Sequence, residues 1–136
     1  MNNQDTDVII IGAGPAGLMA AKKLAESDID YILISRESTP GIDKPCGGYV
    51  PSRALDEFQL KDIRKAHPIK SIRMKFPGHE LKQVDLEKSA GVNVSRENLG
   101  RALLSTVKKS PGQIWLETEC NKVDSTNDGC VICYTM

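Results

Sequence analysis

The chain has 136 residues, enough for one hydrophobic core, and its 18 lysines and arginines balance 18 aspartates and glutamates. A net charge of zero gives no overall field that would recruit nucleic acid or an acidic membrane. The longest apolar run, Val8 to Ala21, is interrupted by Gly-Ala-Gly-Pro, so it is too short to span a bilayer and unlike a signal peptide. We therefore expect a cytoplasmic protein whose four cysteines are thiols.

The first element predicted is a buried parallel strand at Val8–Ile11, a run of β-branched residues. It leads directly into Gly12-x-Gly14-x-x-Gly17, which a helical pattern follows. The first glycine permits a tight turn, the second lets the backbone approach a pyrophosphate, and the third lets the helix lie close to the strand. The pattern predicts a dinucleotide site. The alternative is a strand-helix-strand unit that binds no nucleotide, in which the glycines have no purpose.

The helix that follows is expected to begin at Pro15, because proline lacks an N–H that the first turn would leave unbonded. No carboxylate precedes Glu26, and an N-terminus free of acids is what a bound phosphate requires. The expected apolar face consists of Gly17, Leu18, Ala20, Ala21, Leu24 and Ala25.

A second parallel strand is predicted at Ile29–Ile34. In dinucleotide folds an acidic residue about 20 positions past the glycines binds the ribose hydroxyls. Here Ser35, Arg36 and Glu37 follow the strand. Serine can bond a hydroxyl, though more weakly than a carboxylate. The arginine could instead cover the adenine or meet a phosphate, and the glutamate could substitute from two residues later.

The segment from Glu37 to Pro51 has no periodicity and is rich in proline and glycine, which is typical of a functional loop. A short helix is expected from Pro51. Alternation then predicts a hairpin in which Ile69–Phe76 pairs with Glu80–Leu86 across a Pro-Gly turn.

Ser95 is the expected N-cap of the next helix, which ends near Lys108-Lys109. Its predicted apolar face consists of Leu99, Ala102, Leu103 and Val107. A further strand is predicted at Ile114–Cys120. Asp128-Gly129 then offers a hairpin turn into a last strand at Cys130–Thr135.

Three motifs in this order carry a resemblance to a known family: Gly12-x-Gly14-Pro15-Ala16-Gly17, Asp43-Lys44-Pro45-Cys46-Gly47-Gly48 and Arg96-Glu97-Asn98-Leu99. With them the chain resembles flavoprotein oxidoreductases of the geranylgeranyl reductase family, within the larger group typified by para-hydroxybenzoate hydroxylase. The glycine motif is shared by many flavoproteins, whereas the Lys-Pro-Cys-Gly loop is more specific to this family. The resemblance covers about residues 7 to 123.

The resemblance implies FAD as the cofactor, with the glycine turn on the pyrophosphate and Ser35 at the ribose position. It places Cys46, Gly47 and Tyr49 beside the flavin, and Arg96 on the phosphates or the ribityl chain. Cys120 falls where a strand meets the adenine. With Arg36, which is a candidate from its place after the second strand, the expected cofactor-binding residues are Gly12, Gly14, Pro15, Ala16, Gly17, Ser35, Arg36, Cys46, Gly47, Tyr49, Arg96 and Cys120.

The expected fold is therefore an α/β, Rossmann-like FAD-binding domain, with a parallel sheet and a β-hairpin but incomplete. We expect residues 1–136 to be the N-terminal part of a longer protein, because two clear parallel strands and a third that leads to an unfinished hairpin make an incomplete sheet. One departure from the family is that its distal Gly-Asp flavin motif is absent from these residues. A second departure from the family is Ser35, where a glutamate is usual.

The family's activity would be reduction of double bonds in an isoprenoid or lipid substrate, with electrons from a donor such as NAD(P)H or ferredoxin. Because the substrate would be a lipid, peripheral contact with a membrane is also an expectation. One alternative is a flavin-dependent monooxygenase of the hydroxylase type. Another, from a different class, is a non-catalytic or truncated nucleotide-binding module.

The cysteines allow more than one interpretation. Cys46 is a candidate proton donor or redox thiol beside the flavin, or simply a small residue in a glycine turn. Cys130-x-x-Cys133 looks like half a metal site or a redox pair. Residues three apart on a strand face opposite sides, however, and zinc would need two more ligands. His67 and His79 lie in separate turns, so no metal site is expected.

Overall fold

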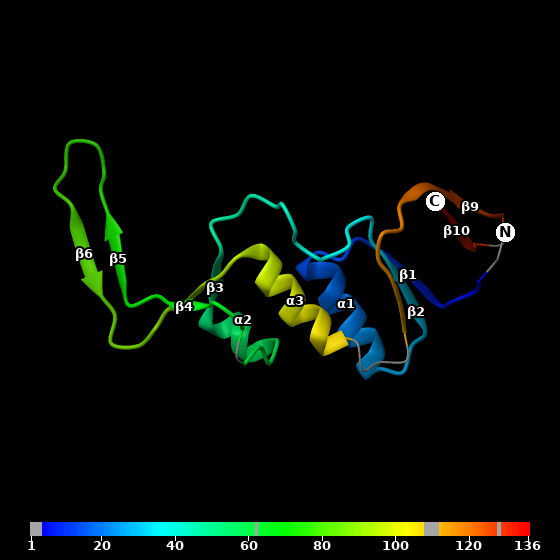
Figure 1. The fold of residues 1–136 in the computed structure, drawn as a ribbon, viewed down its shortest axis with the longest axis horizontal. Coiled ribbons are helices and arrows are strands. Elements are labelled where there is room, and N and C mark those ends of the chain that lie inside the picture. Colours follow the sequence, from blue (N-terminus) through cyan, green and yellow to red (C-terminus); the bar gives the residue numbers. More distant parts are fainter. Residues whose placement is uncertain (1–3, 62, 108–111, 128) are drawn as a thin grey trace.

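The computed structural model describes residues 4–61, 63–107, 112–127 and 129–136. In Figure 1, α1 and α3 lie side by side at the centre, with the β5/β6 hairpin at one end of the molecule and the β9/β10 hairpin at the other. The helices are α1 (Pro15–Glu26), α2 (Ser52–Glu57) and α3 (Arg96–Val107). The strands are β1 (Val8–Ile11), β2 (Tyr31–Ile34), β3 (Tyr49–Pro51), β4 (His67–Pro68), β5 (Ser71–Met74), β6 (Lys82–Asp85), β7 (Gly91–Asn93), β8 (Gln113–Trp115), β9 (Cys120–Ser125) and β10 (Val131–Thr135).

The predicted parallel sheet is present, with the strand order β1-β2-β8. Val8 pairs with Tyr31, and Ile32 pairs with Gln113. The ladder continues past the strands, because the Gly12 N–H donates to the Ile34 carbonyl at 2.8 Å. The β1-α1-β2 unit and the parallel sheet confirm the predicted α/β fold class.

Burial differs between the first two strands. All of β2 is buried, whereas β1 is only half-buried and its last residue, Ile11, is 56% exposed. The prediction of a buried first strand was therefore wrong for these residues. Among the described strands β1 pairs only with β2, so it forms an edge, and β2 takes the central place between β1 and β8.

Both faces of β2 are covered, by different elements. Tyr31 and Leu33 join the core that α1 and α3 form on one side. Their neighbours Ile32 and Ile34 point to the opposite face, because side chains alternate along a strand. There they line a cavity of about 310 Å³ together with residues of β10, including Val131 and Ile132. The two helices, the parallel sheet and the β9/β10 hairpin thus lie one above another.

The two long helices follow the sequence prediction closely. In α1, Leu18 and Ala21 are buried, but Ala20 is exposed and Met19 packs on the core in its place. Ala20 lies two residues, about 200°, around the helix from Leu18, so it faces away from the sheet. In α3 the Asn98 N–H donates to the Ser95 Oγ at 3.2 Å, which confirms the predicted N-cap.

The predicted apolar face of α3 is also confirmed. Leu99, Leu103 and Val107 are buried and Ala102 packs beside them. Lys108 and Lys109, expected near the end of this helix, lie outside the described residues.

A second sheet, with the order β3-β7-β4, lies near α2 and the N-terminal end of α3. This sheet was not predicted. Its strand β3 occupies Tyr49–Pro51, which the sequence indicated as the end of a loop. The strands are close because Gly91 has no side chain: a Cβ there would overlap the Val50 carbonyl oxygen. The predicted short helix after Pro51 is present as α2. Its Ala54 and Leu55, and Phe58 directly after its end, pack on the core.

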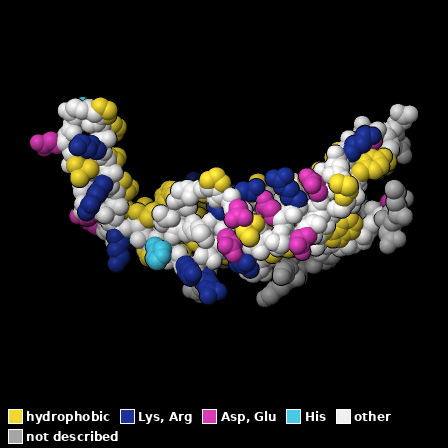
Figure 2. Space-filling view, turned by 45° about the horizontal axis from the view of Figure 1, so that its top comes forward, with side chains coloured by type: hydrophobic (Ala, Val, Ile, Leu, Met, Phe, Trp, Pro, Cys, Tyr) yellow, Lys and Arg dark blue, Asp and Glu magenta, His cyan; other side chains and the backbone are white. Residues whose placement is uncertain are grey.

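The predicted hairpin at residues 69–86 is confirmed as β5 and β6, in which Ile72 pairs with Val84. Every residue of both strands is exposed, and the hairpin forms an arm that projects from the body (Figure 1). One face of this arm is polar, since the Arg73 Nε donates to the Gln83 Oε1 at 2.7 Å. The other carries Ile72, Met74 and Val84, and Figure 2 shows hydrophobic and basic side chains interspersed along the arm.

The continuous strand predicted at Ile114–Cys120 was wrong. The chain leaves the parallel sheet after Trp115, and β9 begins only at Cys120, in a different sheet. Glu117 has a φ of +53°, a left-handed conformation that no strand can accommodate. The hairpin formed by β9 and β10 was predicted, although Asp128 of its turn lies outside the described residues.

Candidate cofactor site

A cavity of about 690 Å³ opens at the carboxyl ends of β1 and β2, where ligands bind in open α/β sheets. The predicted site residues that line it are Gly12, Gly14, Ser35, Arg36, Cys46, Arg96 and Cys120. Those that do not are Pro15, Ala16 and Gly17, in the first turn of α1, Gly47, farther along the loop, and Tyr49, at the start of β3. Segments far apart in the sequence therefore meet at one cavity.

The glycine turn has the geometry that its spacing predicts. Gly12 has a φ of +106°, which side chains other than hydrogen rarely allow. A Cβ at Gly17 would overlap the Gly12 carbonyl oxygen, so this glycine brings the helix against the turn. A Cβ at Gly14 would meet nothing within 4 Å and would project into open space. The backbone of the turn explains the glycine at position 12, and the packing of the helix explains the glycine at position 17. The bare backbone at Gly14 leaves room for a ligand.

The start of α1 is suited to an anion. Gly14 is the N-cap and provides no side-chain hydrogen bond, and the first turn contains no acidic residue. The first α-helical bond joins the Leu18 N–H to the Gly14 carbonyl at 2.9 Å. The N–H groups before it have no intrahelical acceptor, and they carry the positive end of the helix dipole. These groups fit the pyrophosphate of a dinucleotide.

Ser35 is 5% exposed and is held by its backbone on both sides. Its N–H donates to the Trp115 carbonyl at 2.8 Å, and its own carbonyl accepts from the Thr118 N–H at 2.9 Å. The Oγ accepts a long bond of 3.4 Å from the Glu37 N–H. Ser35 thus joins β2 to the segment after β8, and this contact brings residues 118–120 to the cavity.

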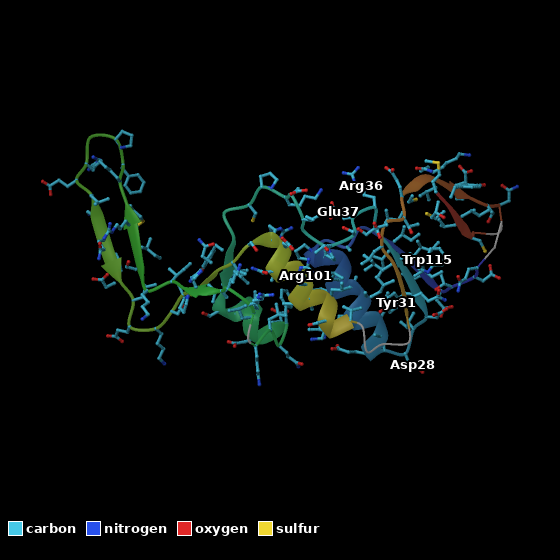
Figure 3. The ribbon with its side chains drawn as sticks, viewed as in Figure 1. Asp28, Tyr31, Arg36, Glu37, Arg101 and Trp115 are labelled. Atoms are coloured by element: carbon cyan, nitrogen blue, oxygen red, sulfur yellow. The ribbon has the colours of Figure 1, made fainter. Side chains whose placement is uncertain are left out.

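The wall beside Ser35 contains an ion pair in which the Lys44 Nζ lies 2.7 Å from the Glu37 Oε1. The hydrogen bond from Lys44 lowers the pKa of the Glu37 carboxyl below its ordinary value. In Figure 3, Arg36 and Glu37 lie at the carboxyl end of β2, whereas Asp28 lies at the opposite end of the sheet. The sequence offered Glu37 only as a substitute for Ser35, and Lys44 only as part of a motif.

The loop from Thr39 to Gly48 is fixed on the start of α3 by close backbone contacts. A Cβ at Gly41 would overlap the Arg96 carbonyl oxygen, and one at Gly100 would overlap the Pro40 carbonyl oxygen. Arg96 itself is half-buried and lines the cavity. Within the described ranges its guanidinium has no hydrogen bond or ion pair, so it is available to an anionic group.

Cys46 lines the cavity, and its exposed Sγ accepts from the Gly48 N–H at 3.4 Å. Both interpretations of this thiol, beside a ligand and within a glycine turn, are thus compatible with its place. Tyr49 is exposed on β3, and its hydroxyl donates to the Ala90 carbonyl at 3.1 Å. Cys120, at the start of β9, also lines the cavity, and its Sγ lies 3.7 Å from the Lys122 carbonyl oxygen.

Two further properties concern only the part of the chain that the structure describes. No group of three or more histidine, cysteine or acidic side chains is arranged there to hold a metal ion. None of its helices is long and apolar enough to cross a membrane.

The chain is similar in sequence to known reductases of geranylgeranyl compounds. A digeranylgeranylglycerophospholipid reductase of Methanosphaera stadtmanae is 25% identical over 134 residues, which are 94% of this chain and 34% of that protein. A geranylgeranyl diphosphate reductase of Rhodobacter capsulatus is 30% identical over 117 residues, which are 83% of this chain and 29% of that protein. The chain thus spans about a third of the length of these relatives. They confirm the resemblance to geranylgeranyl reductases.

Solved structures share the fold. A geranylgeranyl bacteriochlorophyll reductase-like protein of Thermoplasma acidophilum superposes with a TM-score of 0.83 at 23% identity, covering 96% of this chain and 34% of that one. The flavin-dependent monooxygenase PieE, in complex with FAD and substrate, gives a TM-score of 0.74 at 19% identity, covering 99% of this chain and 27% of that one. A family model described as an FAD binding domain matches residues 5–130, nearly the whole chain. The chain therefore belongs to the FAD-binding domain family, and FAD is its cofactor.

Proposed function

We propose that the protein containing this chain is an FAD-dependent oxidoreductase that reduces the double bonds of a geranylgeranyl or related isoprenoid lipid. The observation that supports it most is the cavity in which the Lys44–Cys46 loop meets the glycine turn and Arg96. The names of the relatives, all about three times as long as this chain, support the substrate class. When bound, FAD supplies the hydride that reduction of a carbon–carbon double bond requires.

The chain's own residues position the cofactor in this proposal. The open backbone at Gly14 and the uncapped N–H groups of α1 bind the pyrophosphate. Ser35 hydrogen-bonds a ribose hydroxyl, and Glu37 lines the cavity two residues farther along the chain. Arg96 neutralises a phosphate or bonds the ribityl chain. The other predicted positions, Cys46 with Gly47 and Tyr49 near the flavin and Cys120 near the adenine, remain part of the proposal.

The proposal extends to the rest of the protein. Residues 1–136 form the N-terminal part of its FAD-binding domain, and the remainder of that domain and a substrate domain lie beyond them. Electrons come from NAD(P)H or from a ferredoxin, and the protein works in the cytoplasm.

The lipid substrate gives the β5/β6 arm a place in this proposal, as a site of peripheral membrane contact. Apolar Phe76 and Leu81 flank its tip and are 62% and 56% exposed. The basic residues of the arm and its base are Lys70, Arg73, Lys75, Lys82 and Lys88; the acidic ones are Glu80, Asp85 and Glu87. Basic residues beside apolar ones favour the surface of an anionic membrane.

A monooxygenase is the second candidate, because the structural neighbours include PieE and p-nitrophenol 4-monooxygenase, both at a TM-score of 0.74. These likenesses are below 25% identity and concern the fold alone. A monooxygenase inserts an oxygen atom from O₂, whereas a reductase adds two hydrogens and needs no oxygen. The two functions therefore differ in the mass of the product.

The test uses the full-length protein with FAD and geranylgeranyl diphosphate, without oxygen. NADPH, NADH and reduced ferredoxin are supplied in separate reactions, and the products are analysed by mass spectrometry. The proposal predicts a product heavier by two hydrogens per reduced double bond. A product heavier by one oxygen, formed only in air, would establish the monooxygenase. Bound FAD with no turnover under either condition, for isoprenoid or aromatic substrates, would favour a non-catalytic module.

A further inference from the structure

Two cysteines lie on neighbouring strands of the hairpin that borders the FAD cavity. Cys120 begins β9 and lines the cavity, while Cys133 lies on β10. Thr135 pairs with Cys120 across the hairpin, and a register shift lies between Tyr134 and Thr135. Cys133 is two residues from Thr135 on the same strand, so its side chain is on the same face as that of Cys120.

Cys133 is half-buried, and burial, together with the neighbouring Cys120 thiol, raises the pKa of its thiol to about 11. This pair differs from the Cys130–Cys133 pair that the sequence motif suggested. Cys130 lies three residues from Cys133 and precedes the start of β10.

We propose that Cys120 and Cys133 form a reversible disulfide whose formation and FAD binding oppose each other. The oxidant is a hydroperoxide such as hydrogen peroxide. The Cys120 thiolate attacks one peroxide oxygen, the O–O bond breaks, and the released hydroxide takes up a proton to become water. The Cys133 sulfur then displaces the sulfenic oxygen of Cys120 as a second water. Two thiols thus lose two electrons and two protons, and one peroxide is reduced to two waters.

The order of the two steps follows from the surroundings of each sulfur. Cys133 is half-buried and its pKa is raised, so it is the poorer nucleophile toward a free peroxide. It reacts second, with the sulfenic acid on the neighbouring strand, and its proton leaves with the sulfenic hydroxyl as water. Cys120 lies on the cavity wall, where a small peroxide can reach it when no cofactor is bound. A bridge to β10 draws the Cys120 sulfur out of the cavity lining and fixes the start of β9.

FAD binding and disulfide formation oppose each other in both directions, because the two equilibria are thermodynamically linked. If FAD covers Cys120, bound FAD slows the oxidation, and the oxidised protein must bind FAD more weakly by the same coupling free energy. This inference depends on the FAD cavity and not on the isoprenoid substrate. A failure of the reductase assay would leave it standing, and its own failure would leave the reductase assay unaffected.

The intact apoprotein is treated with hydrogen peroxide, its remaining thiols are alkylated, and the linked peptides are mapped by mass spectrometry. We expect a Cys120–Cys133 peptide pair lighter by two hydrogens. Saturating FAD slows its formation by about fivefold or more, and the oxidised protein binds FAD at least about fivefold more weakly until dithiothreitol reverses the change.

Two matched variants separate this pair from the sequence motif. Cys130→Ser keeps both the disulfide and its effect on FAD. Cys133→Ser removes both, while the reduced variant binds FAD as the wild type does, because Cys133 does not line the cavity. The peptide map of the wild type needs no variant, so it decides the linkage even if Cys133→Ser fails to fold. A Cys130–Cys133 linkage, no linkage, or equal FAD affinity of the oxidised and reduced forms would overturn the proposal.

Discussion

Strands β2 and β5 have the same length but opposite surroundings. The four residues of β2 are all apolar and all buried, between β1 and β8 and between the helices and the β9/β10 hairpin. The four residues of β5 alternate between polar and apolar, and all are exposed. A continuous apolar run requires two covered faces, whereas alternation requires only one. The described residues supply both covers for β2 and none for the apolar face of the arm.

The first prediction tests this contrast with one substitution in each strand. Leu33→Ala should lower the free energy of unfolding by about 2–5 kcal/mol, because Leu33 is fully buried in the core. Ile72→Ala, at a side chain that is 41% exposed, should lower it by less than about 1 kcal/mol. Urea unfolding of the purified protein measures both. Equal losses would mean that the arm is covered in solution.

The second prediction concerns the tightest packing in the nucleotide-binding half. Gly17→Ala should cost about 1–3 kcal/mol of stability, since the new Cβ would overlap the Gly12 carbonyl oxygen and backbone must move. Gly14→Ala is the matched control in the same turn, because its Cβ would meet nothing. Thermal unfolding without cofactor compares them. If Gly14→Ala proved as damaging as Gly17→Ala, the described turn geometry would be wrong.

The third prediction concerns the arm. Phe76→Ser should leave the melting temperature nearly unchanged but weaken binding to anionic phospholipid vesicles by about tenfold, because an exposed aromatic ring is lost from the tip. Ser71→Ala, on the polar face, should change neither property. Vesicle sedimentation measures the bound fraction. Binding that is unaffected by Phe76→Ser, or absent from the wild type, would contradict a membrane role for the arm.

The smallest effect is expected at the Glu37–Lys44 pair. The folded pKa of Glu37 lies below its ordinary 4.5, so the pair stabilises the protein above that pH and ceases to do so as pH falls through the lower, folded value. At pH 7 Glu37→Gln should therefore be less stable than the wild type by under about 1 kcal/mol, since half of Lys44 is exposed. Unfolding at pH 7 and at pH 4 or below should show the gap closing; a gap that widens in acid would contradict the assignment.

The sequence predicted the elements whose signals are local. The β1-α1-β2 unit, the Ser95 cap of α3 and both hairpins follow from periodicity and turn residues near one another in the chain. The β3-β7-β4 sheet could not be predicted, because its strands have two or three residues and pair across long separations. The break near Glu117 lacked a glycine to mark its left-handed backbone.

The residues of the candidate site also fall into those that local sequence signals predicted and those that they did not. Gly12, Gly14 and Arg96 were found from motifs, and the cavity brings them together. Lys44 and Thr118 were missed as lining residues, because their places depend on contacts between distant segments: Gly41 against Arg96 and Ser35 with Thr118. A sequence pattern states which backbone positions are special, but not which distant side chains tertiary contacts bring beside them.

The most direct test of the central claim is an FAD titration of the intact apoprotein and its Gly14→Val variant, followed by flavin fluorescence. Gly14 has an extended backbone with a φ of −69°, and its missing Cβ faces open space, so valine should leave the empty fold intact. The account predicts saturable one-to-one binding by the wild type, weakened by about 100-fold or more in the variant, because the branched side chain occupies the pyrophosphate's place. Equal affinity in two equally stable proteins would contradict the assignment of the glycine turn to FAD.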